Sequence, residues 1–114
     1  MKQAVIISEP ALCDLLSIND YYLLTVSDKT AAAIIDRLEA TINSLADFPE
    51  RGSIPKELLA LGIGQYRQII TKPYRIIFEV LPKKVVVHAV LDGRRDMQDL
   101  LTQRLVKLNN FNHP

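Results

Sequence analysis

The chain has 114 residues, which is the usual size of one globular domain, and no low-complexity tract divides it. Its 48% hydrophobic and 24% charged residues are typical of a folded protein and exclude an intrinsically disordered chain. Because 14 basic residues are balanced by 13 acidic ones, a surface that is cationic all round and grips nucleic acid everywhere is also excluded.

The first half of the chain predicts a strand and two helices. A β-branched run within residues 3–8 indicates a short buried strand, and Ser8 can cap a helix over roughly residues 10–25. The apolar face predicted for this helix consists of Leu12, Leu15, Leu16, Tyr22 and Leu23. Ser27 or Asp28 caps a second helix, and the short linker predicts an antiparallel hairpin. The apolar stripe of the second helix consists of Ala31, Ile34, Ile35, Leu38, Ile42 and Leu45.

The second half of the chain changes to strand-like patterns. A turn over residues 48–55 and one helical turn over residues 56–61 precede three closely spaced runs, which predict an antiparallel meander. The strands are expected at residues 66–71, 74–81 and 85–91. A last amphipathic helix is expected over residues 96–108.

Together these elements predict an α+β fold. An N-terminal strand and a helical hairpin pack on one face of a mainly antiparallel sheet, and a C-terminal helix follows. Residues 1–108 are expected to form the single domain and residues 109–114 a flexible tail.

Strand alternation predicts which side chains share a face of the sheet. If the turn after the first meander strand brings Thr71 beside Arg75, one face carries Arg67, Ile69, Thr71, Arg75, Ile77, Glu79, Val86, His88 and Val90. The opposite face, packed on the hairpin, then carries Tyr66, Ile70, Tyr74, Ile76, Phe78 and Val80. A slip of one residue would reverse either assignment, so this register is a hypothesis. The aliphatic residues of the first face require a cover, which is either the C-terminal helix or a partner chain.

Cys13 is the only cysteine, which excludes an intramolecular disulfide and favours a reducing compartment. Its place on the first helix predicts a packed, apolar side chain. The apolar run at the N-terminus is too short for a signal peptide, and no run approaches the roughly 18–20 residues that cross a bilayer. We therefore expect a cytoplasmic protein with no membrane partner.

The charges of the chain are unevenly distributed. Residues 1–60 carry five basic and nine acidic side chains, whereas residues 61–114 carry nine basic and four acidic ones. Four arginines of the second half lie on or just beyond consecutive strands: Arg67, Arg75, Arg94 and Arg95. If they converge, their guanidinium groups could bind phosphate, and His88 could act as acid or base in RNA cleavage. The alternative is that they pair with carboxylates, Arg67 with Glu79 and the loop arginines with the aspartates around them.

No cofactor or metal is expected. The two glycines at positions 62 and 64 lack the further glycine and following helix of a dinucleotide-binding loop. His88, His113 and Cys13 are too scattered to form a zinc site, and no serine lies in a nucleophile elbow.

Six segments, taken in order, resemble the RelE/ParE toxin superfamily. They are residues 48–52 (FPERG), 66–67 (YR), 72–80 (KPYRIIFEV), 90–96 (VLDGRRD), 100–101 (LL) and 104–105 (RL). The resemblance runs from Gln3 to about Leu108, and the ordered set of motifs carries it. It implies the family's fold of a strand, a helical hairpin, three strands and a terminal helix.

The resemblance implies a toxin of a type II toxin–antitoxin pair, a class associated with plasmid stabilisation. In that family a disordered segment of the cognate antitoxin folds onto the toxin and silences it. The antitoxin is commonly also the DNA-binding member, so no direct DNA binding is expected from the toxin alone.

The family divides by target, and its RelE-like members are endoribonucleases that cut ribosome-bound mRNA. On their pattern, the catalytic candidates of this chain are Arg67, Arg75, Arg95 and His88. However, Ile69 stands where a second lysine is often found, and Leu101 falls near the expected tyrosine. The near-neutral net charge is also unfavourable for RNA binding. The nuclease pattern is therefore incomplete.

The chain resembles ParE-like members more closely. These inhibit DNA gyrase by binding it and are not themselves enzymes. We therefore expect a gyrase inhibitor held by its antitoxin, with Arg94 and Arg95 as candidate target-binding residues because of the local positive charge. The alternatives are a RelE-like mRNA interferase that acts at the ribosome and a relic of the toxin fold that only binds its partner.

Overall fold

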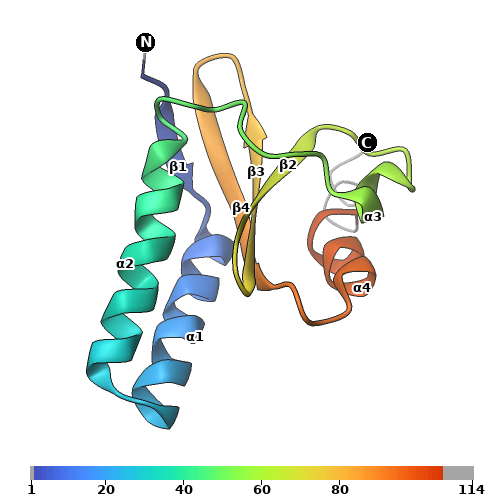
Figure 1. Cartoon of the computed structure of the whole chain (residues 1–114). Helices are drawn as coiled ribbons and strands as arrows, with labels where there is room; N and C mark the ends of the chain where they lie inside the picture. Colours follow the sequence, from blue (N-terminus) through green and yellow to red (C-terminus); the bar gives the residue numbers. More distant parts are fainter. Residues whose placement is uncertain (1, 107–114) are drawn as a thin grey trace.

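The computed structural model describes residues 2–106 (Figure 1). Along the chain lie β1 (Ala4–Ile7), α1 (Glu9–Thr25), α2 (Asp28–Ser44), α3 (Lys56–Leu59), β2 (Tyr66–Thr71), β3 (Tyr74–Val80), β4 (Lys84–Asp92), α4 (Met97–Leu101) and η1 (Thr102–Val106). The segment η1 is a π-helical continuation of α4. The last residues of the predicted C-terminal helix and the predicted tail at residues 109–114 lie outside the described residues.

Short-range capping determines where the two long helices begin. The Ser8 side chain accepts a hydrogen bond from the backbone N–H of Ala11 at 3.3 Å, and Pro10 lies in the first turn, where its missing N–H costs nothing. Ser27 caps α2 in the same way and accepts from the N–H of Thr30 at 3.1 Å. Both predicted caps are confirmed, with Ser27 as the cap of the second helix.

The four strands form one mixed sheet in the order β1-β4-β3-β2. β2, β3 and β4 make the predicted antiparallel meander, whereas β1 runs parallel to β4 at one edge. Figure 1 shows α1 and α2 on one face of the sheet and α3 and α4 on the other. The α+β fold is confirmed, but helices cover both faces and not one alone.

Each face of the sheet has its own apolar core. The hairpin-side core contains Ala11, Leu15, Leu38, Ile42, Leu45, Tyr74, Ile76, Phe78, Val85, Val87 and Val90. The opposite core contains Leu58, Tyr66, Ile77, Ala89, Leu91, Met97, Leu101 and Leu105. The predicted stripe of α2 is confirmed, because its residues are buried or packed against the first core. Of the two predicted covers for the second face, the chain's own C-terminal helix is the one observed.

The pairing of β2 differs from the prediction by one residue. The β2–β3 connection has two residues, so Thr71 pairs with Tyr74 and not with Arg75. Because adjacent side chains in a strand alternate, this shift reverses every side chain of β2. Arg67 therefore lies on the hairpin face, and Tyr66 lies in the opposite core.

A β-bulge also changes the predicted alternation in β4. One extra residue, His88, lies opposite the step between Ile77 and Phe78. His88 stays on the face predicted for it, whereas Val90, predicted to lie beside it, packs in the hairpin-side core. The bulge thus places the β4 side chains after His88 on the face opposite to the one predicted for them.

The inner face of α1 differs from the prediction as well. Leu15 is buried, but Leu12, Leu16 and Leu23 are 48%, 56% and 42% exposed. Cys13, predicted to be packed, is exposed. The inner residues of α1 are Ala11, Leu15, Ile18 and Tyr22. Apolar residues occur around more of this helix than one stripe, so spacing alone did not indicate which face is buried.

Candidate functional site

The two candidate target-binding arginines lie in the loop between β4 and α4, at the lower end of the sheet in Figure 1. Asp92 holds Arg94, whose backbone N–H, Nε and Nη2 donate to the carboxylate at 2.9, 3.0 and 2.6 Å. The hydrogen bonds from Arg94 lower the pKa of Asp92. Arg95 donates only its backbone N–H, to the Asp92 carbonyl, and within residues 2–106 its guanidinium has no hydrogen bond or ion pair.

A cavity of about 330 Å³ opens beside this loop. Its α1 wall consists of Asp14, Ser17, Ile18 and Tyr21. The sheet contributes Tyr74, Val90 and Leu91, and the loop contributes Asp92, Arg94 and Arg95. The cavity therefore combines an apolar floor with a charged rim.

Two tyrosines meet beside this cavity. The Tyr74 hydroxyl donates to the Tyr22 hydroxyl at 3.1 Å. Burial raises the pKa of Tyr74 above its ordinary range, and the bond to Tyr22 raises it further. Tyr74 is thus a neutral hydrogen-bonding group near pH 7 and is poorly suited to proton transfer at that pH.

Asp14, which was not among the residues predicted from the sequence, organises the edge of β4. Its carboxylate accepts two hydrogen bonds from the Arg104 guanidinium, both at 3.0 Å, and one from the backbone N–H of Val90 at 3.0 Å. Arg104 also donates to the carbonyl of His88 at 3.2 Å. β1 pairs with β4 only as far as Val87. Beyond that residue, side chains supply the hydrogen bonds to the backbone of β4 that a neighbouring strand would otherwise make. The ion pair joins residues 90 positions apart, which leaves no local sequence signal.

Arg75 is held within the fold. Its Nε donates to Gln68 at 2.7 Å, and its two terminal nitrogens donate to Glu57 at 2.9 and 2.8 Å. The Arg75 and Glu57 side chains are only 12% and 13% exposed. Arg75 lowers the pKa of the Glu57 carboxyl through this hydrogen-bonded pair. The guanidinium of Arg75 therefore fastens α3 to the sheet.

Arg67 is held as well, but on the hairpin face of the sheet. Its guanidinium donates to the backbone carbonyls of Glu50, Arg51 and Gly52 at 2.8, 3.1 and 2.8 Å. The predicted pairing of Arg67 with Glu79 is wrong, because the shifted register places the two side chains on opposite faces.

His88 takes the place predicted for Arg67 beside Glu79. Its Nε2 lies 2.9 Å from the Glu79 carboxylate, and both side chains are 22% exposed. The imidazole ring meets the ring of Tyr66 edge to face at 5.3 Å. His88 is thus packed between a carboxylate and an aromatic ring.

The structure does not bring the four candidate nuclease residues together. The sheet separates Arg67 from Arg75 and His88, and Arg95 lies in the loop beyond β4. Arg67 and Arg75 therefore do not converge, whereas Arg94 and Arg95 lie side by side in an exposed loop.

Two further features bear on the kind of site. Within residues 2–106, no three side chains of metal-ligating type are grouped so that they could hold an ion. In that same part of the chain, no helix combines the length and hydrophobicity needed to cross a membrane.

Comparison with known proteins identifies the family. The profile of the family described as "ParE toxin of type II toxin-antitoxin system, parDE" matches residues 5–97. A solved chain described as "Chromosomal ParDE TA system from P. aeruginosa" shares the fold, with a TM-score of 0.66 and 16% identity over 78% of this chain and 94% of that one. No curated protein matches the sequence. Since the family match spans most of the chain, this protein belongs to the ParE toxin family of type II toxin–antitoxin systems.

Proposed function

We propose that this chain inhibits DNA gyrase by binding it and that a cognate antitoxin neutralises it in the cytoplasm. The observation that carries the proposal is how the arginines are used. Arg67 and Arg75 are bound within the fold, whereas Arg94 and Arg95 are exposed in one loop. An exposed cationic loop on a folded scaffold suits contact with a protein surface.

The same observation weakens the mRNA interferase alternative. A cation that stabilises a phosphorane must reach the transferring phosphate with free donors. The donors of Arg75 face Glu57 and Gln68, and those of Arg67 face three backbone carbonyls. Because the sheet separates Arg67 from Arg75 and His88, the strand candidates cannot act together on one phosphate.

Exposed apolar side chains on the hairpin support an antitoxin partner. Both faces of the sheet are covered by the chain's own helices, so the sheet is not the open apolar surface. On α1, however, Leu12, Leu16 and Leu23 are about half exposed, and Leu24 is 86% exposed. Apolar area of this extent is typical of a surface that a partner covers. We therefore propose that the antitoxin packs along the outer side of α1.

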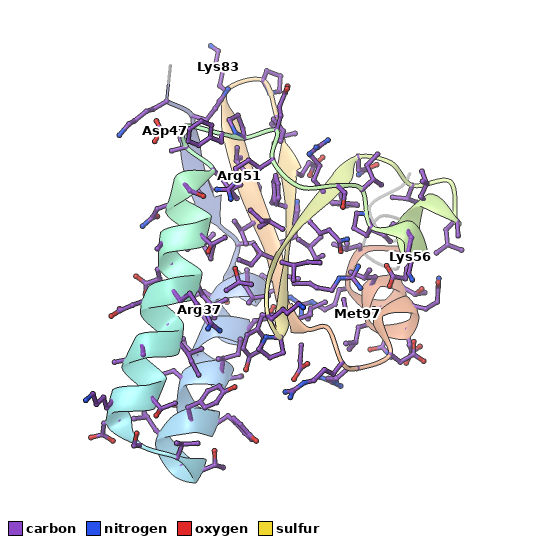
Figure 2. The ribbon with its side chains drawn as sticks, viewed as in Figure 1. Arg37, Asp47, Arg51, Lys56, Lys83 and Met97 are labelled. Carbon is purple, nitrogen blue, oxygen red and sulfur yellow. The ribbon has the colours of Figure 1, made fainter. Side chains whose placement is uncertain are left out.

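A supercoiling assay with purified DNA gyrase tests the target. We expect the wild-type protein to inhibit supercoiling and the double variant R94Q/R95Q to be about tenfold less potent, because it lacks the exposed cations. K83Q is the matched control, since Figure 2 places Lys83 at the opposite end of the sheet from Met97, which follows the loop. Undiminished supercoiling with the wild-type protein would contradict the proposal, and cleavage of ribosome-bound mRNA in a parallel assay would support the interferase instead.

Coexpression with the antitoxin, which we expect the neighbouring reading frame to encode, tests the proposed antitoxin surface on α1. Leu16→Glu should fold normally because Leu16 is 56% exposed, yet it should weaken the complex about tenfold by burying a charge. Ala33→Glu adds the same charge at an exposed position of α2 and is the control. Equal binding by the two variants would place the antitoxin elsewhere.

A further inference from the structure

We propose that the cavity between α1 and the β4–α4 loop is an anchor site for one acidic side chain of a protein partner, flanked by apolar residues of the same partner segment. The inference deepens the proposed function, on which it rests, because it assigns a ligand chemistry to the Arg94–Arg95 loop.

The charges around the cavity cancel except at one residue. The Asp14 carboxylate is neutralised by Arg104, and the Asp92 carboxylate by Arg94. Arg95 is exposed, and its guanidinium has no ion pair within residues 2–106. Counting Arg104, which pairs with Asp14 but does not line the cavity, one positive charge at Arg95 is left uncompensated, which matches one anionic group.

The size and floor of the cavity match side chains. A volume of about 330 Å³ is at the lower end of the range for ligand sites, roughly 300–1,000 Å³, so the cavity suits one or two side chains better than a cofactor. Ile18 and Tyr21 of α1 provide apolar contact. An aliphatic residue beside the acidic one would fill this part.

The fixed groups of the rim favour a carboxylate over a phosphate. A phosphate that carries about two negative charges would lie near the carboxylates of Asp14 and Asp92, and like charges repel. Bidentate phosphate binding by two arginines is also blocked, because the fork of Arg94 is occupied by Asp92. A single carboxylate needs only Arg95 and meets less repulsion.

NMR titration of the ¹⁵N-labelled full chain tests the site with defined probes. We expect acetyl-Leu-Glu-Leu-amide to shift the amide signals of Ser17, Ile18 and residues 90–95 with millimolar affinity. The isosteric acetyl-Leu-Gln-Leu-amide should bind about tenfold more weakly, since it lacks the charge-assisted hydrogen bond. Equal binding of the two peptides, no binding of either, or stronger binding of inorganic phosphate or single-stranded tetrauridylate at these residues would overturn the inference.

Three variants separate the cavity from general surface charge. Arg95→Gln should reduce binding of the glutamate peptide about tenfold, whereas Lys83→Gln, at the other end of the sheet, should leave it unchanged. Ser17→Phe keeps every charge but fills the cavity from an exposed helix position, and it should abolish binding. Unchanged binding by Ser17→Phe would overturn the site even if Arg95→Gln weakens it.

The outcome of the peptide titration is independent of the outcome of the gyrase assay. If the glutamate peptide binds but gyrase is not inhibited, the anchor site stands and the proposed target is wrong. If gyrase is inhibited but the peptide does not bind, the inference fails and the proposed function stands.

Discussion

Gly52 shows how one backbone position ties a loop to the sheet. Its φ of +81° lies in the left-handed region, and a Cβ at this position would lie 1.9 Å from the carbonyl oxygen of Gln68. The next residue, Ser53, exchanges backbone hydrogen bonds with Gln68 at 3.1 and 2.7 Å. The carbonyl of Gly52 also accepts from Arg67 at 2.8 Å. Glycine is required here by both conformation and space.

Replacing Gly52 by alanine should therefore be severe. We expect Gly52→Ala to lower the free energy of unfolding by at least about 3 kcal/mol, because the left-handed conformation costs an alanine roughly 1–2 kcal/mol and the contact with Gln68 forces the backbone apart. Gly62→Ala is the control: its φ is +77°, but no atom lies within 4 Å of the added Cβ, so only the conformational cost of about 1–2 kcal/mol should be lost. Urea denaturation measures both, and equal losses would contradict the steric argument.

Glu57 links folding stability to pH at the residue scale. Its pKa is lowered in the folded state, chiefly by the hydrogen bonds from Arg75. A carboxyl with a depressed pKa contributes stability above its unfolded pKa and loses it as pH falls through the folded value. We expect the free energy of unfolding to fall between about pH 5 and pH 3, and to fall less in Glu57→Gln.

The same variant should also be less stable at neutral pH. Removing the partner of a largely buried guanidinium should cost about 3–5 kcal/mol at pH 7. Asp28→Asn, at an exposed carboxylate, is a suitable control. Urea denaturation measures the free energy of unfolding at each pH. If it falls equally with pH in Glu57→Gln and in the wild type, the Glu57–Arg75 pair does not link stability to pH.

At the scale of elements, the Asp14–Arg104 pair joins α1, β4 and η1. Because Asp14 also accepts from the N–H of Val90, it holds the first helix against the strand as well as against the C-terminal segment. The two side chains are 19% and 26% exposed, so solvent screens the pair only in part. The pair therefore couples elements from the two ends of the chain.

A double-mutant cycle with Asp14→Asn and Arg104→Gln measures this coupling. Each single variant should lose about 1–3 kcal/mol of stability, and the double variant should lose less than the sum by about 1 kcal/mol or more. Hydrogen exchange should show faster opening of the amides of residues 97–105 in both single variants. Additive losses would indicate that the two residues act independently.

At the scale of the whole molecule, the sheet is shared by two cores. Leu38 is fully buried in the hairpin-side core, and Leu101 is fully buried in the opposite core. Because β3 and β4 contribute side chains to both, loss of one core removes the support of the sheet on which the other packs.

This arrangement predicts one cooperative unfolding transition. Leu38→Ala and Leu101→Ala should each cost about 2–5 kcal/mol and lower the urea midpoint without changing the slope. Far-UV circular dichroism and near-UV signals from the tyrosines, which occur in both cores, should give the same midpoint. A separate early transition in Leu101→Ala would show that the C-terminal layer unfolds alone.

Local patterns were sufficient to predict the elements. Capping by Ser8 and Ser27, the apolar stripe of α2 and the three strand-like runs are short-range properties, and each is observed close to its predicted place. On α1 the predicted stripe included Leu12, Leu16 and Leu23, which are about half exposed. A helix that is apolar on two sides has no unique inner face until its neighbours are known.

The candidate site was predicted only in part. Arg94 and Arg95 are found together in an exposed loop because they are adjacent in sequence. The partners of Arg67 and Arg75 were not predictable, because they depend on strand register and on the distant segments that pack on each face. Asp14 gave no signal, since its partner Arg104 lies 90 positions away.

By itself, the sequence determined the class of fold, the order of its elements and the family, because these depend on residue types at short spacing and on motifs in order. Only the tertiary structure decided how the arginines are used and where a partner could bind. The physical reason is that side chains in a strand alternate between the two faces of the sheet. The β2–β3 turn is one residue shorter than predicted, so Arg67 lies on the opposite face from Arg75. That separation removes the common phosphate site, whereas Arg94 and Arg95 stay together in an exposed loop beside the cavity.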